Sequence, residues 1–301
     1  MSSPEMLSRE AETTLSAAEK LWLDGELTRA AEATRHARQQ ARASADVETE
    51  VAALIQQGDI DGQLGHLDAA RAAYGEARTL SAAGKDQHRQ ASLLLRLGDV
   101  AHRQERIDEA RALLESAVEM FDAASDRKGH AHALKRLGHL WRDSGDEGKA
   151  LDCYRKALGL CVHAGDSLGE AHLRTALAPV LERLGKTDQA HQAWEAAVDL
   201  FAQNGDLLGQ ARAMTGLGCL LRHLGLGTEA LERLSAAAKL YARAGHLRGE
   251  ADLSMEMAGL SRHLGELGHA RHHYSRAADL YGHLNATELR FKALKEFELL
   301  S

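Results

Sequence analysis

Proline, aromatic residues and cysteine are all scarce in this chain of 301 residues. Proline occurs twice and aromatic residues make up 4% of the sequence. So few helix breakers, in a chain dominated by Ala, Leu, Glu and Arg, favour an all-helical protein. The three cysteines (Cys153, Cys161 and Cys219) are too few and too scattered for a disulfide framework. They are typical of small buried side chains in a reducing compartment.

Long apolar runs and a strong excess of one charge are also missing. No stretch holds eighteen consecutive apolar residues, and the first ten residues contain no apolar signal segment. We therefore expect neither a membrane span nor secretion. The net charge of −7 does not mark the chain for nucleic acid or acidic membranes. These absences predict a soluble cytoplasmic protein, and the hydrophobic content of 44% is enough for a large core.

A repeat of 40 residues organises the sequence. Seven blocks begin, without insertion or deletion, at Ala11, Val51, Ala91, Ala131, Ala171, Ala211 and Ala251. Positions 20 and 27 are Ala in every block, and position 8 is always Ala or Gly. Position 15 is Gly in all blocks but one, which has Glu105. Recurrence at one fixed period is the sequence signature of a repeat architecture.

Each block predicts a pair of helices. Small residues at fixed positions let two helix backbones approach closely, and Gly at position 15 can take positive φ and end the first helix. Positions 20, 24, 27, 30 and 31 are apolar in most blocks, as in those of Ala150 and Ala190, and form one face at the helical period. We expect the first helices to be capped by residues such as Asp166 and Asp206. The second helices are predicted to be capped by Thr28, Asp68, Asp108, Thr187 and Thr228.

The two ends of the chain depart from the repeat. Residues 1–10 are predicted to be a disordered N-terminus, the seven repeats occupy residues 11–286, and residues 287–301 are predicted to form a C-terminal capping helix. In that last helix we expect Phe291, Leu294 and Phe297 to face inward. A helix pair of this size cannot bury its apolar face alone, so stacking of neighbours and capping of the ends are both needed.

The pattern resembles the tetratricopeptide repeat in having Leu-Gly at positions 7 and 8, Ala at 20 and Ala at 27. Its clearest copies run from Leu137-Gly138 to Ala157 and from Leu217-Gly218 to Ala237. The block length and linker are similar to the long-repeat class of the Leu-Gly-Asn-repeat polarity adaptors and many bacterial regulators. The resemblance implies an all-α, right-handed superhelical α-solenoid of seven helix pairs. The Asn that follows Leu-Gly in those adaptors is absent here, so their peptide-backbone clamp is not expected.

In the family that it resembles, the first helices line a concave groove, and positions 2, 5, 9, 12 and 13 point into it. From the third block onward these positions are rich in Arg and His. The predicted partner-binding residues are Arg103, Lys135, His139, Arg142, Arg183, Arg212, Arg222, His223, Arg262, His263 and Trp22. Arg pairs bidentately with carboxylates, which favours an acidic peptide or partner helix as the ligand. The alternative interpretation is a solvated face on which Arg142 and Asp143, or Glu182 and Arg183, neutralise each other.

The N-terminal part of the groove is predicted to be more apolar. Its apolar residues are Leu15, Trp22, Leu23, Ile55 and Leu95. Trp22 either anchors a partner side chain or belongs to the core of the first repeat. Several His among Arg also raise the possibility of a groove that responds to pH near neutrality.

The predicted function is a non-catalytic protein–protein interaction scaffold. Its alternative is a regulatory module that senses a ligand or a peptide. Nucleic-acid binding is less favoured, because the chain is acidic overall and Trp22 is the one groove aromatic available for base stacking. No nucleophile motif, phosphate loop or paired carboxylates indicate an enzyme. The His pairs lack a third ligand at metal-binding spacing, so neither a metal nor a cofactor is expected, and the oligomeric state is left open.

Overall fold

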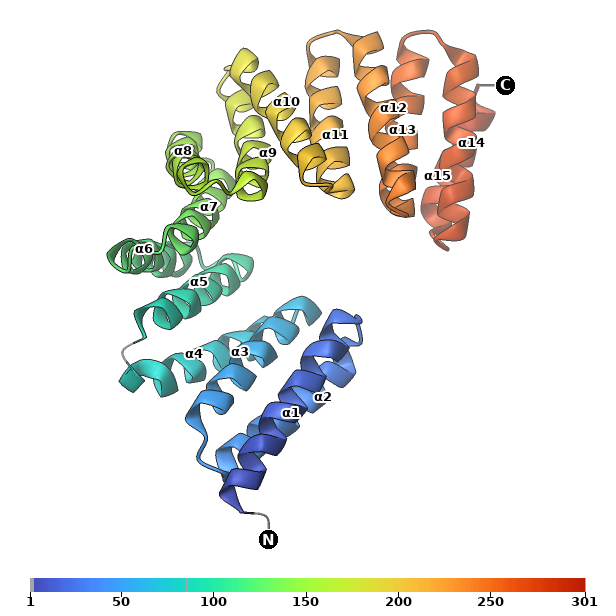
Figure 1. Ribbon diagram of the computed structural model, residues 1–301. Coiled ribbons are helices and arrows are strands. Elements are labelled where there is room, and N and C mark those ends of the chain that lie inside the picture. The colour runs from blue at the N-terminus through green and yellow to red at the C-terminus, as the bar shows by residue number, and fades with distance from the viewer. Residues whose placement is uncertain (1–2, 85, 301) are drawn as a thin grey trace. The chain divides into compact units, whose positions relative to one another are not determined.

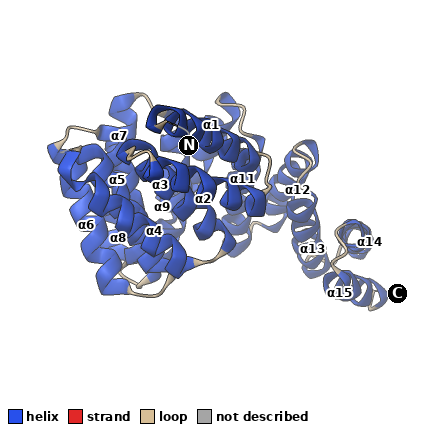
Figure 2. Ribbon diagram, turned by 90° about the horizontal axis from the view of Figure 1, so that it is seen from below, coloured by secondary structure: helices blue, strands red, loops and turns tan. Residues whose placement is uncertain are grey.

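A computed structural model describes residues 3–84 and 86–300. Over these residues the chain is built from fifteen α-helices and one short 3-10 turn at Ala82–Gly84, with no strand (Figure 2). The predicted all-α class is confirmed. The helices are α1 (Pro4–Leu23), α2 (Leu27–Ala43), α3 (Val47–Leu64), α4 (Leu67–Ser81), α5 (Gln87–Arg103), α6 (Ile107–Ala123), α7 (Arg127–Asp143), α8 (Glu147–Ala164), α9 (Ser167–Arg183), α10 (Thr187–Gln203), α11 (Leu207–His223), α12 (Gly227–Arg243), α13 (Leu247–His263), α14 (Leu267–His283) and α15 (Thr287–Glu298).

The helices follow the 40-residue register (Figure 1). Odd-numbered helices from α1 to α13 are the first helices of seven pairs, even-numbered ones are the second helices, and α15 follows the last pair. From α3 onward each first helix begins four residues before its block, as at Val47 and Gln87 for the blocks starting at Val51 and Ala91. The chain divides into two compact units, residues 1–160 and residues 161–301.

Most of the predicted helix ends are confirmed. The Gly residues at position 15 all have positive φ, and Glu105 takes the same left-handed conformation in the block that lacks Gly. Asp166 and Asp206 cap α9 and α11 by accepting hydrogen bonds from the backbone N–H three residues on. The caps expected for the second helices are wrong. Thr187 and its counterparts lie inside the first helical turn, and the residues at the caps make no side-chain hydrogen bond to the backbone.

The prediction of a disordered N-terminus is wrong for residues 4–10. These residues form the first turns of α1, which begins at Pro4 and is capped by the Ser3 hydroxyl, the acceptor from the Met6 N–H. Pro suits the first turn of a helix because its missing N–H would have no partner there. Residues 1 and 2 lie outside the described residues.

The core is made of clusters in which first and second helices pack closely through small residues. The Ala side chains at positions 20 and 27 are fully buried in every block. Gly at position 8 receives the side chain at position 24 of the same pair, as where Gly58 meets Tyr74, and Gly138 meets Tyr154. These contacts confirm that the small residues that recur in each repeat set how closely the two helices of a pair pack.

The side of α15 that faces the solvent is not the one that the apolar pattern predicted. Phe291 and Leu294 are exposed, whereas Ala293 is fully buried against α14. Phe297 is half-buried, with the guanidinium of Arg271 over its ring at 4.9 Å. The expectation that Phe291 and Leu294 face inward is therefore wrong, because α15 turns a different side toward its neighbour.

Candidate functional site

The predicted groove positions lie on one face of the first helices in each unit, which we call the first-helix face. In the unit of residues 1–160 this face holds a pocket of about 550 Å³. The pocket is lined by Trp22, Asp59, Gly62, Gln63, Tyr74, Arg96, Asp99, Val100, His102, Arg103 and Arg136. Of the predicted site residues, Trp22 and Arg103 meet here.

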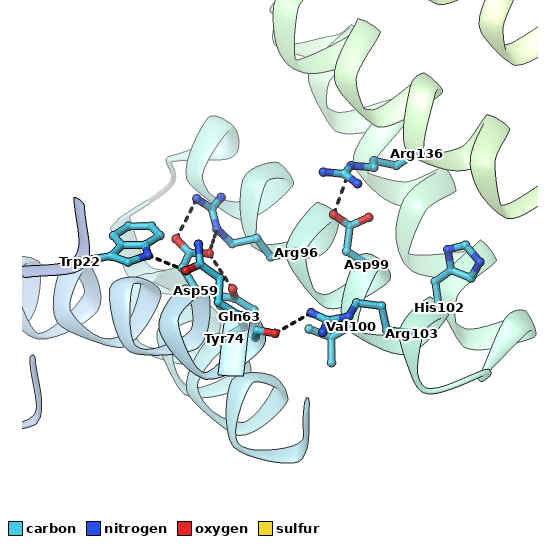
Figure 3. Close-up of a pocket in the computed structure, with 11 residues that line it drawn as sticks. Trp22, Asp59, Gln63, Tyr74, Arg96, Asp99, Val100, His102, Arg103 and Arg136 are labelled. Carbon is cyan, nitrogen blue, oxygen red and sulfur yellow. Dashed lines mark hydrogen bonds and ion pairs between the residues drawn. The ribbon is translucent and has the colours of Figure 1, made fainter. Parts of the chain in front are cut away.

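Two Asp–Arg pairs link successive first helices across the pocket. Nε of Arg96 in α5 donates to Oδ1 of Asp59 in α3 at 3.0 Å, and Nε of Arg136 in α7 lies 3.3 Å from Oδ2 of Asp99 in α5. The Tyr74 hydroxyl also donates to Asp59, at 2.6 Å. Figure 3 shows the side chains of each pair turned toward one another. Burial of Tyr74 and the adjacent Asp59 carboxylate raise the pKa of the phenol, so it stays a hydrogen-bond donor.

The rim of the pocket is held by hydrogen bonds to α3. Nε1 of Trp22 donates to the amide oxygen of Gln63 at 2.9 Å, and Nη1 of Arg103 donates to the carbonyl of Gly62 at 2.8 Å (Figure 3). Trp22 is half-buried and also packs on a small cluster that contains Ile60. It therefore contributes to both the core of the first repeat and the wall of the pocket.

Burial makes Asp99 in the pocket less acidic than an ordinary aspartate. Its pKa is raised above the ordinary value because burial penalises the charged form, and this outweighs the nearby Arg136, His102 and Arg96. The pocket as a whole carries three guanidinium groups against two carboxylates. Its electrostatic balance therefore favours an incoming negative group.

Two of the predicted partner-binding residues of α7, Arg142 and His139, are engaged by neighbouring side chains. Arg142 pairs with its neighbour Asp143, with Nη2 and Oδ1 2.8 Å apart, as the solvated-face interpretation expected. Nδ1 of His139 lies 2.6 Å from the Tyr154 hydroxyl. Burial, followed by Arg142 and Arg136, lowers the pKa of His139 to about 4, so this residue is neutral at neutral pH. His139 therefore stays a predicted partner-binding residue, but one that would offer a neutral imidazole rather than a cation.

A groove that titrates near neutrality through α7 is likewise not supported. Burial, followed by Arg136 and Lys135, lowers the pKa of His132 to about 4. Lys135 is half-buried on the same helix. His132 and His139 thus change charge well below neutral pH.

In the unit of residues 161–301 the remaining predicted residues are exposed on α9, α11 and α13. They are Arg183, Arg212, Arg222, His223, Arg262 and His263. Arg262 donates to the Glu296 carboxylate of α15 at 2.5 Å. Glu182, which precedes Arg183, accepts a hydrogen bond from Nε1 of Trp194 at 2.8 Å.

The N-terminal part of the first-helix face is acidic, not apolar as expected. A recess of about 380 Å³ between α1 and α3 is lined by Glu12, Leu15, Ser16, Glu19, Glu48, Thr49 and Ala52. Of the apolar residues predicted here, Leu95 is buried in the core and Leu23 is exposed at the end of α1. Helix periodicity placed these residues on the first helices but did not specify which neighbours would cover them.

Sequence reasoning missed Arg96 and Arg136. Both stand at position 6, outside the positions expected to point into the groove, whereas Asp59 and Asp99 stand at position 9, which is one of those positions. The available signal was the spacing: each Asp is followed 37 residues later by its Arg partner. A spacing just short of the 40-residue period brings position 9 of one block beside position 6 of the next.

Neither a metal-binding cluster nor a membrane-spanning helix is found among the described residues. No group of three or more His, Cys, Asp or Glu side chains converges in a way that could hold a metal ion. No helix over the described ranges is long and apolar enough to cross a membrane.

Comparison with known families matches the repeat directly. Residues 89–161 and residues 175–245 each match a family model described as tetratricopeptide repeat. The chain is a tetratricopeptide-repeat protein. Its assignment to the long-repeat class stays a prediction. No curated protein sequence matches this tetratricopeptide-repeat chain significantly.

Solved structures share its α-solenoid fold at low sequence identity. A Rap protein complexed with competence and sporulation factor has a TM-score of 0.61 and 13% identity, covering 97% of this chain and 98% of that one. BtubC from P. vanneervenii has a TM-score of 0.61 and 16% identity, covering 81% and 93%. A signal transduction ATPase with a tetratricopeptide repeat sensor, from Pyrococcus horikoshii, has a TM-score of 0.66 and 16% identity. It covers 99% of this tetratricopeptide-repeat chain, which spans 48% of that protein.

Proposed function

We propose that this tetratricopeptide-repeat protein is a non-catalytic interaction scaffold that binds an acidic peptide segment or partner helix on its first-helix face. The pocket around Arg103 and Arg136 anchors one acidic side chain of that segment. The single observation that carries this proposal is the excess of guanidinium groups over carboxylates in a pocket of about 550 Å³ whose polar groups already hold one another in place.

The paired carboxylates favour binding over catalysis. Asp59 and Asp99 are each engaged by an Arg of the next repeat, so they act as fixed supports for the guanidinium groups. The Arg136 side chain remains 41% exposed and can offer its planar fork to an incoming carboxylate. Burial raises the pKa of the Cys153 and Cys219 thiols to about 11, which keeps them protonated and weakly nucleophilic. The three cysteines form no disulfide, which fits a proposed cytoplasmic location.

The acidic recess between α1 and α3 indicates how charge is distributed along the proposed ligand. Glu12 and Glu19 repel negative charge at that end of the face, whereas Glu48 is paired with Arg89, with Oε2 and Nη2 2.7 Å apart. We infer that the bound segment is acidic where it meets Arg103 and Arg136 and neutral or basic where it meets the recess. Arg183, Arg212, Arg222, His223, Arg262 and His263 extend the proposed acidic specificity in the second unit.

Fluorescence anisotropy with two labelled peptides tests the proposal. One probe is a short amphipathic peptide rich in Glu and Leu, and the other has every Glu replaced by Lys. We expect the Glu probe to bind more tightly by about tenfold or more, corresponding to ~1.4 kcal/mol. Arg103→Glu with Arg136→Glu should remove that preference. Equal binding of both probes, or an unchanged double variant, would contradict the proposed site.

A matched control lies in the same unit. Arg78 is an exposed residue of α4, on a second helix and away from the pocket. Arg78→Glu changes the net charge in the same direction but should leave binding of the Glu probe within about twofold of the wild type. A comparable loss in this control would mean that the net charge, rather than the pocket, governs binding.

A regulatory module that senses a ligand or a peptide is the second candidate. The Rap protein complex and the tetratricopeptide repeat sensor of the signal transduction ATPase favour it, since both match nearly the whole of this chain in fold. Small-angle scattering with and without the Glu probe separates the two functions. A sensing module should change its radius of gyration on binding, whereas a static scaffold should not.

A further inference from the structure

Helix α15 continues the repeat register. The eighth block would begin at Phe291, 40 residues after Ala251, and α15 begins four residues earlier at Thr287. The same offset places Leu247 four residues before Ala251. By register α15 is therefore the first helix of an eighth repeat, rather than a helix of a different kind.

The packing of α3 and α5 shows that a first helix has two sides with different neighbours. Val51 and Leu54, at positions 1 and 4, pack in one cluster with Tyr74 and Ala77 of their own second helix. Leu93 and Leu97, at positions 3 and 7 of the next block, join the same cluster from the other side. Positions 3 and 7 thus face back to the preceding repeat, and positions 1 and 4 face forward to the second helix of the same repeat.

In α15 the side that faces the preceding repeat (positions 3 and 7) is covered. The side with positions 1 and 4, which we call the forward side, is exposed. Ala293, at position 3, is fully buried in a cluster with Tyr281 of α14. Phe291 and Leu294, at positions 1 and 4, are 69% and 40% exposed. Position 1 is at most 5% exposed in the seven complete repeats. The forward side of α15 is therefore an exposed apolar surface, whereas its position-1 counterparts in the complete repeats are all buried.

Two residues show that this surface is not shaped for an ordinary second helix. Position 1 is Ala or Val and position 8 is Ala or Gly in every complete repeat, but here they are Phe291 and Glu298. The side chain at position 24 of a second helix packs so closely on position 8 that a Cβ on Gly138 would lie 2.5 Å from Tyr154. Glu298 blocks that approach, so another kind of helix must cover the surface.

The charges on the forward side match those of a second copy. Glu288 and Lys295 are exposed and seven residues apart, so they lie two turns apart on the same face, on either side of Phe291 and Leu294. When two such helices pack antiparallel about a two-fold axis near Phe291, Glu288 of each lies beside Lys295 of the other. Such an isologous contact is self-complementary in shape and in charge.

We propose that the forward side of α15 is a self-association surface through which two copies of this chain form a dimer. Phe291 and Leu294 form its apolar centre, and two Glu288–Lys295 ion pairs set its antiparallel register. One helix face buries less area than a standard stable interface, so the dimer is weak and reversible. This inference does not depend on the peptide-binding site proposed above.

Sedimentation equilibrium of the full chain at about 1–200 μM, concentrations that bracket a weak interface, tests this surface. The wild type should show a reversible monomer–dimer equilibrium, and Phe291→Asp should be monomeric throughout with unchanged helical circular dichroism. Leu267→Asp is the control, since Leu267 is 50% exposed on α14, outside the proposed surface. It should dimerise like the wild type. A monomeric wild type, or a Phe291→Asp variant that still associates, would overturn the proposal.

A charge exchange tests the antiparallel register. At low salt Glu288→Lys alone or Lys295→Glu alone should weaken the dimer about threefold or more, because each places like charges opposite one another. The combined variant Glu288→Lys with Lys295→Glu should restore wild-type association. Failure of the combined variant to recover would overturn the proposed pairing, and capture of a different protein's helix by a strictly monomeric chain would assign the surface to that partner instead.

Discussion

At the scale of single residues, the fold depends on side chains that are small where helices meet. Gly138 lies against the buried ring of Tyr154, and an added Cβ would come within 2.5 Å of it. Gly75 lies in α4 with nothing within 4 Å of where its Cβ would be. The two glycines therefore have opposite structural consequences, although both are in the middle of helices.

We expect Gly138→Ala to lower the free energy of unfolding by about 1–3 kcal/mol, because the buried Tyr154 ring cannot move without disturbing its neighbours. Gly75→Ala should raise it by roughly 0.5–1 kcal/mol, since Ala is the better helix former and meets no neighbour. Urea denaturation of both variants measures the difference. A stabilising Gly138→Ala would show that the helices of this pair can separate at little cost.

At the scale of one element, α7 concentrates the electrostatics of the first-helix face. His132 and His139 share this helix with Lys135, Arg136 and Arg142. Burial, with these cations adding to it, lowers the pKa of both histidines to about 4. In the unfolded chain they return to the ordinary value near 6.5. The folded protein therefore binds fewer protons than the unfolded chain over the interval between these values.

The sign of the pH dependence follows from that difference. Stability from the two neutral histidines is fully present above pH 6.5 and is lost as pH falls from 6.5 toward 4. The half-buried His139 contributes a slope of at most about 1.4 kcal/mol per pH unit, and the exposed His132 contributes less because solvent screens its charge. His132→Gln with His139→Gln should flatten the dependence in this window, compared with the wild type, in urea midpoints measured from pH 7 to 4.5. Parallel curves for variant and wild type would mean that neither histidine is protected from protonation in the fold.

At the scale of the whole molecule, stability is local because contacts run mainly between neighbouring helices. The two compact units, residues 1–160 and 161–301, each contain several complete pairs. In an array of this kind the total stability is approximately a sum of repeat and nearest-neighbour contributions. A destabilising substitution in one repeat should therefore lower mainly the stability of the unit that contains it.

Leu234→Ala probes this locality. Leu234 is buried in α12 and packs over Gly218, so its truncation should cost about 2–5 kcal/mol. In hydrogen exchange, amides of α11 to α13 should lose protection most, whereas those of α3 and α4 should keep wild-type rates. Equal loss of protection throughout the chain would indicate a single cooperative unit instead.

The sequence predicted the helices far better than the site. Positions such as Ala197 and Gly138 have one structural role in each repeat, so their recurrence predicts helix pairs without further information. The pocket joins Asp59 to Arg96 and Asp99 to Arg136, and these contacts depend on how far one repeat is displaced against the next. Basic positions were identified, but the burial that makes His139 neutral could not be read from them.

By itself, the sequence determined the seven helix pairs, their left-handed turns and the small residues between them, because helix formation and close packing obey short-range rules that repeat every 40 residues. Only the tertiary structure decided which Arg residues are held by Asp, which histidines lose their charge, and which side of α15 stays open. These features depend on neighbours outside the helix. Helical periodicity predicts an apolar face, such as that of Phe291 and Leu294. It does not specify which helix, of this chain or of another, packs on that face.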